Sequence, residues 1–126
     1  MKKINTLLFL FFTLNLFAQP NLNVSLVGQL DYPQTLSDVW GYAAPDGTEY
    51  ALVGMQNGVS IVSLADPANP AELFFVPGAN SIWRDIKTWD GFAYVTNENS
   101  GGVAVIDLRG LPDSIDSYNW APNIGG

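Results

Sequence analysis

Short apolar segments alternate with turn residues along the chain from residue 38 to residue 120. Glycine, proline, asparagine and aspartate separate these segments. None of the segments repeats its apolar residues every 3.6 positions with charges on the opposite side, as an amphipathic helix would. The pattern therefore predicts an all-β protein with strands over residues 38–43, 50–54, 59–64, 72–76, 82–88, 92–96, 103–108 and 114–120.

The segment over residues 37–64 is repeated in residues 81–108. Matching positions are Ser37 and Ser81, Asp46-Gly47 and Asp90-Gly91, and the apolar runs 58–64 and 102–108. The period is roughly 42 to 44 residues, which is the length of a four-stranded propeller blade. The differences in length fall in predicted turns, where a strand repeat tolerates them.

The runs 59–64 and 103–108 place apolar side chains on both faces of the strand, so each strand is expected to lie between two layers. Blades stacked around an axis bury both faces of each sheet in this way. We therefore predict an all-β fold, a β-propeller fragment of about two four-stranded antiparallel blades that form an incomplete ring. An open β-sandwich is the alternative, because regularly spaced short strands also suit it. The internal repeat argues against the sandwich.

The N-terminus has the pattern of a secretory signal peptide. Lys2 and Lys3 precede an apolar run over residues 4–17, and Ala18 follows the run. This run is shorter than the roughly 20 apolar residues that a transmembrane anchor needs. We therefore predict a chain that is exported through the Sec pathway and is secreted or displayed at the cell surface, with no transmembrane segment in its mature part.

The predicted domains follow from the leader and the repeat: a signal peptide over residues 1–19, an N-terminal strand over 20–36, a blade over 37–80 and a truncated blade over 81–126. The N-terminal strand is expected to close the last blade of the ring. Because propellers have roughly four to eight blades, we expect the chain to be an N-terminal fragment.

Composition and charge narrow the range of functions. The chain has 5 Lys and Arg against 12 Asp and Glu, a formal net charge of −7, so nucleic acid is not expected as a partner. It contains no cysteine and no histidine, which excludes thiolate and imidazole chemistry and nearly all zinc and copper sites. No cofactor is predicted, and the expected partner is an extracellular protein, peptide or glycan.

Three segments resemble a known family. The segments 37–42, 57–70 and 81–87 resemble the LVIVD-repeat proteins called choice-of-anchor B, and residues 93–107 look like the YVTN type of propeller repeat. The resemblance covers most of the chain after the leader. It implies an exported bacterial propeller with a variable C-terminal anchoring signal, and it implies no catalytic activity that can be assigned to particular residues.

The candidate binding residues lie in the predicted innermost strands of the two copies, near the expected central channel. They are Arg84, Asp85, Asp38, Trp40 and Trp83. The structural alternative is that Arg84 pairs with a carboxylate such as Asp38 between the blades. In the same way, the tryptophans, with Trp89, form either an aromatic platform for a ligand or packing between blades.

Two further groups of residues carry oxygen ligands or carboxylates. Asn97, Glu98 and Asn99 lie in a glycine-rich turn and offer oxygen ligands to a cation such as Ca²⁺, but their spacing matches no known calcium loop, which favours turn chemistry. Carboxylates for acid–base catalysis are available in Asp38, Asp85, Asp90 and Glu98, but their spacing selects no pair.

We predict a non-catalytic interaction module. The alternatives are an extracellular enzyme whose active site is assembled from several blades, and a structural or adhesive surface repeat. The fold by itself does not distinguish these functions.

Overall fold

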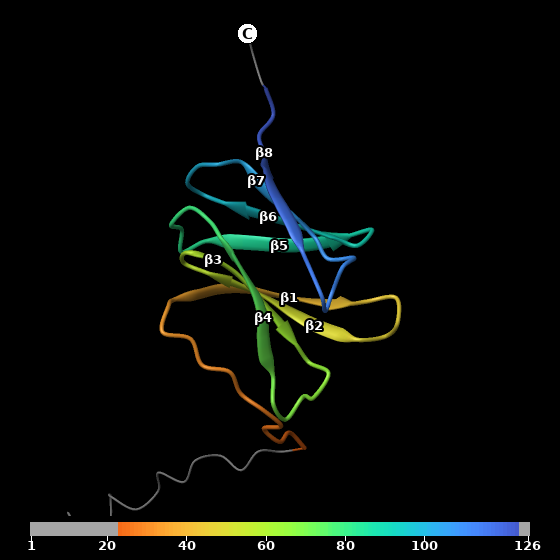
Figure 1. Ribbon diagram of the computed structural model, residues 1–126. Helices are drawn as coiled ribbons and strands as arrows, with labels where there is room; N and C mark the ends of the chain where they lie inside the picture. Colours follow the sequence, from red (N-terminus) through yellow and green to blue (C-terminus); the bar gives the residue numbers. More distant parts are fainter. Residues whose placement is uncertain (1–22, 124–126) are drawn as a thin grey trace, which may run out of the picture.

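The structure, a computed structural model, describes residues 23–123 and contains two four-stranded antiparallel sheets (Figure 1). The strands are β1 (Leu36–Ala43), β2 (Glu49–Met55), β3 (Gly58–Ser63), β4 (Ala71–Pro77), β5 (Arg84–Trp89), β6 (Phe92–Asn97), β7 (Val103–Asp107) and β8 (Asp116–Trp120). Each sheet is a meander in which neighbouring strands follow one another in the sequence, β1 to β4 in blade 1 and β5 to β8 in blade 2. All eight predicted strands are confirmed, with ends that differ by at most two residues.

The described residues contain no helix long and apolar enough to cross a membrane.

The hairpins follow from the turn residues. In blade 2, Trp89 pairs with Phe92, so Asp90 and Gly91 alone connect β5 to β6. Asp90 has φ 50° and Gly91 has φ 78°, the left-handed conformations that a two-residue hairpin with the right-handed strand twist requires. The Asp-Gly sequence adopts them at low cost.

The strand registers confirm the repeat in the central strands. Leu52 pairs with Ile61 in blade 1, and Tyr94 pairs with Val105 in blade 2, as the alignment of the two sequence copies requires.

The first strands are aligned differently from the prediction. Tyr42 pairs with Tyr50 in blade 1, and Trp89 pairs with Phe92 in blade 2, which makes Trp89 the counterpart of Tyr42. The predicted match of Ser37 with Ser81 is wrong, because Ser37 lies within β1 whereas Ser81 precedes β5. A register shift in β1 and a longer first hairpin cause the difference.

The core lies between the two sheets, which pack face to face with β1 beside β5 (Figure 1). Both blades contribute aliphatic side chains to it, and the fully buried members are Leu52, Ile61, Ile86, Ala93, Val95, Ile106 and Leu108. Removal of this apolar surface from water is the main force that holds the blades together. We call this contact between the blades the seam.

The N-terminal segment lies along blade 1 on the side opposite the seam. Residues 24–30 form no strand in the structure, and Gly28 passes so close to blade 1 that a Cβ atom there would lie 2.2 Å from the Pro67 carbonyl oxygen. The predicted closing strand is therefore not seen. Pairing of this segment with a last blade stays a prediction. The signal peptide over residues 1–19 lies outside the described residues.

Candidate functional site

Arg84 connects blade 2 to blade 1 through backbone carbonyl groups. Its Nε donates to Met55 O at 2.7 Å, and its Nη2 donates to Gln56 O at 3.3 Å and to Ala79 O. The side chain is only 8% exposed, and this burial lowers the pKa of Arg84. A buried charge is tolerated when hydrogen-bond acceptors surround it, as they do here.

Asp38 makes the reciprocal contact from blade 1 to blade 2. Its Oδ2 accepts from the backbone N–H of Ile86 at 2.8 Å, and its Oδ1 accepts from the N–H of Val39 at 2.9 Å. The structural alternative in which Arg84 pairs with a carboxylate such as Asp38 is therefore wrong. Each side chain instead makes hydrogen bonds with backbone groups of the other blade. Both residues therefore hold the two blades together at the seam.

Trp40 also belongs to the seam. Its indole N–H donates to the Thr88 hydroxyl across the two blades at 3.0 Å, and the Lys87 ammonium lies 4.4 Å from the centre of its ring. Trp83, which precedes β5, and Trp89, the last residue of β5, are 66% and 76% exposed. The three tryptophans therefore do not form the single aromatic platform that was one of the predicted alternatives.

Asp85 lies on the other side of β5, away from the seam. Its carboxylate is 2.5 Å from the Lys87 ammonium, and both side chains are more than half exposed. An exposed ion pair of this kind contributes little to stability, so Asp85 has no structural partner comparable to that of Asp38.

A groove opens where the first hairpins of the two blades meet. It has a volume of about 510 Å³. We call it the hairpin groove, and its lining consists of Gly41, Tyr42, Ala43, Pro45, Thr88, Trp89, Asp90, Gly91 and Arg109. Blade 1 therefore supplies a mostly apolar wall and blade 2 a wall with one acid and one base.

Arg109 is held in place at the groove by two interactions. Its Nε and Nη2 donate to the two carboxylate oxygens of Asp107 at 2.9 and 2.6 Å, and its guanidinium lies 4.5 Å from the centre of the Phe92 ring. The Arg109 hydrogen bonds lower the pKa of Asp107 to about 2. The guanidinium keeps further N–H groups that a ligand could bind, because the fork has five donors.

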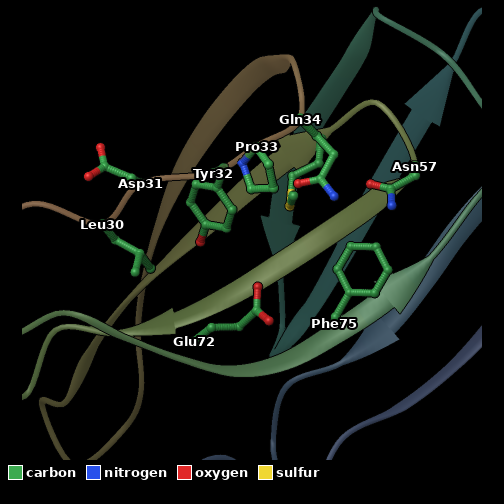
Figure 2. A pocket seen from close by; sticks show the side chains of 9 residues that line it. Leu30, Asp31, Tyr32, Pro33, Gln34, Asn57, Glu72 and Phe75 are labelled. Carbon is green, nitrogen blue, oxygen red and sulfur yellow. The ribbon is translucent and has the colours of Figure 1, made fainter.

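A second pocket lies between the N-terminal segment and blade 1, and Figure 2 shows its lining. It has a volume of about 340 Å³. The Ser60 hydroxyl donates to Glu72 at 2.5 Å and lies 2.7 Å from the Tyr32 hydroxyl. Burial raises the pKa of Tyr32. These contacts fix the N-terminal segment on blade 1. On the same wall, the Asn57 Oδ1 atom is buried without a hydrogen-bond partner.

The turn after β6 is shaped by its own side chains. Asn97 Oδ1 accepts from the backbone N–H of Asn99 at 2.9 Å, and Asn99 Nδ2 donates to Asn80 O. These contacts agree with the turn interpretation. Over residues 23–123, the structure contains no group of three His, Cys, Asp or Glu residues that could hold a metal ion.

The sequence prediction missed the hairpin groove. Its base, Arg109, occupies a position where the first copy of the repeat has Ala65, and this difference between copies was the available signal.

Comparison with protein-family models, with curated proteins and with solved structures gives no match to the chain.

Proposed function

We propose that this protein is a non-catalytic binding module that acts outside the cytoplasm and recognises a peptide segment of a partner protein through the hairpin groove. The observation that carries the proposal is the composition of the groove. Tyr42, Trp89 and Arg109 all belong to its lining, and tyrosine, tryptophan and arginine are the residues that dominate binding energy at protein interfaces.

The geometry of the groove supports a ligand that is partly apolar and partly polar. Tyr42 and Pro45 offer contact area from blade 1, whereas Asp90 and Arg109 offer an acceptor and donors from blade 2. Such a mixture orients a peptide by a few hydrogen bonds while apolar contacts supply affinity. Both walls lie on hairpins of packed blades, so few side chains and loops lose conformational freedom when a ligand binds.

The test uses a random-peptide library displayed on phage and the immobilised chain from Pro20 onwards. We expect enriched peptides, and we expect Arg109→Gln to weaken the binding of those peptides by about tenfold or more, the usual effect of losing a hydrogen bond from a charged group. Lys87→Gln is the matched control, because it removes the other exposed cation of the described residues at a position outside the groove. No enriched peptide, or equal losses in both variants, would exclude the proposal.

Export has its own test. The pattern of Lys2, Lys3 and the apolar run supports removal of the leader during secretion. Mass spectrometry of the exported protein is expected to show a chain that begins near Pro20. Exported material that still contains Lys2 and Lys3 would contradict it. We further propose, on the three segments that resemble them, that the protein is related to the LVIVD-repeat, choice-of-anchor B proteins.

A further inference from the structure

The side of blade 2 that faces away from the seam has the same layout as the side of blade 1 that the seam buries. In blade 1, Ile61 pairs with Leu52 on one side and with Phe74 on the other, and this row packs against blade 2. The matching row of blade 2 is Tyr94, Val105 and Tyr118. Side chains of paired residues in a sheet point to the same face, so the second row forms the corresponding surface of blade 2.

The aromatic side chains of this outer face are exposed, whereas Val105 between them is only 5% exposed. Tyr118 is 61% exposed and Trp120 is 53% exposed, although their counterparts Phe74 and Val76 contact the core of the seam. Large aromatic side chains in register on one sheet face are a surface that normally has a partner.

The polar groups of the seam have counterparts as well. Tyr42 of β1 corresponds to Trp89 of β5. Four residues earlier, on the same face of each strand, Asp38 corresponds to Asp85. Asp38 accepts the backbone N–H of Ile86 from the first strand of the next blade. Asp85 has no such N–H group within reach in the described residues and holds only the exposed Lys87.

The acceptors of Arg84 are also repeated. Arg84 binds the carbonyl groups of Met55 and Gln56, at the end of β2 and just after it. Met55 pairs with Leu36 at the start of the first strand, and Asn97 pairs with Arg84 in the same place in blade 2. Asn97 and Glu98 therefore offer the corresponding pair of carbonyl groups beside the outer face.

We propose that the outer face of blade 2 binds a third blade of this same repeat, and that Asp85 accepts a backbone N–H from the first strand of that blade. The partner is a four-stranded antiparallel sheet with an aliphatic inner face and an arginine at the position of Arg84. The proposal rests on the observed seam, whose contacts it repeats one blade further along, and it is independent of the hairpin groove.

A second copy of the chain fits this face less well. The blade that would dock uses the side facing its predecessor, and in blade 1 the N-terminal segment already lies on that side, with Tyr32 bound to a fully buried Ser60. The equivalent side of blade 2 is already engaged in the seam through Ile86 and Ile106. Neither sheet of a second copy therefore offers a free side of the required kind.

The test extends the protein by one blade. Residues 20–121, without the predicted leader, are followed by a copy of residues 78–123, so that β8 connects to the added blade as β4 connects to β5. Because the chain has no cysteine, Tyr118→Cys provides a single thiol on the outer face. We expect maleimide labelling of this thiol to be at least tenfold slower in the extended chain than in the original chain. Thr96→Cys repeats the measurement on β6, and Ala65→Cys, in an exposed loop of blade 1, is expected to label equally fast in both chains.

A second measurement tests the role of Asp85. Asp85→Asn is expected to lower the melting temperature of the extended chain by roughly 4 °C or more and to leave that of the original chain nearly unchanged. Asp113→Asn, in an exposed turn, is the control for loss of a carboxylate.

Three results would overturn the proposal. The first is equal labelling of Tyr118→Cys in the two chains although far-ultraviolet circular dichroism shows that the strands of the added blade have folded. The second is an equal effect of Asp85→Asn in both chains. The third is protection of the original chain that increases with protein concentration, because a second copy would then occupy the face.

Discussion

The substitution Arg84→Met removes the three hydrogen bonds of the guanidinium across and beside the seam while it keeps an unbranched side chain. A hydrogen bond from a charged group contributes about 1.5–3 kcal/mol, and an acceptor that stays buried without a partner costs about 1–3 kcal/mol. Met55 is a buried residue, whereas Gln56 and Ala79 lie outside the strands, where water can replace the guanidinium. The methionine also avoids the cost of burying a charge.

These opposing effects give an expected loss of about 3 kcal/mol in the free energy of unfolding, close to one charge-assisted hydrogen bond plus one unsatisfied carbonyl group. For a domain of this size the loss corresponds to a melting temperature lower by about 12 °C. Arg84→Lys retains the charge but has no planar fork, so we expect a smaller loss of about 1–2 kcal/mol.

The assay is urea unfolding followed by tryptophan fluorescence and by far-ultraviolet circular dichroism, with Lys87→Met as the control. Lys87 is exposed, and its ion pair and its contact with Trp40 are expected to contribute less than about 1 kcal/mol together. If Arg84→Met destabilises the protein no more than Lys87→Met does, the seam does not depend on the buried guanidinium, and the reasoning is wrong.

Three further predictions concern the seam and the turns. Trp40→Phe and Thr88→Val are each expected to lower the free energy of unfolding by about 1 kcal/mol. The double variant should lower the free energy of unfolding by less than the sum of the two losses, because both changes remove the same hydrogen bond. Additive losses in a double-mutant cycle would contradict the contact. Gly91→Ala is expected to destabilise the protein by about 1–2 kcal/mol because φ is 78° there, whereas Gly41→Ala, whose Cβ would meet no atom within 4 Å, should change the melting temperature little. The folded-state pKa of Asp107 is lowered to about 2. The contribution of Asp107 to stability is therefore complete above its unfolded pKa of about 3.9 and is lost as the pH falls toward 2. Carboxyl NMR titration should show the lowered pKa, and a value near 3.9 would contradict the contact with the Arg109 guanidinium.

Local sequence was sufficient to predict the strands and most of their pairing. Apolar runs bounded by Gly, Pro and Asp indicated where each strand begins and ends, because strand-forming and turn-forming residues alternate along the chain. The pair Asp90-Gly91 indicated a tight hairpin, since few residues adopt a positive φ without strain. The repeat indicated two similar sheets, and the two sheets have the same central registers.

The candidate site could be predicted only in part. The structural alternative placed Arg84 and Asp38 between the blades, where both lie, but it named the wrong partners. The partners are backbone groups, and a carbonyl or N–H group has no signature in the sequence. The match between β1 and β5 was missed because a register shift in β1 and a change in hairpin length move the structural counterpart away from the residue of the same type.

The amino-acid sequence by itself determined the all-β class, the strand boundaries and the two-fold repetition, because these depend on side-chain size, polarity and backbone preference within a few residues. Only the tertiary structure decided which side of each sheet is buried, which polar groups meet at the seam and where the hairpin groove lies. Those features depend on distances between residues far apart in the chain, such as Asp38 and Ile86, and such distances exist only once the two sheets have packed together.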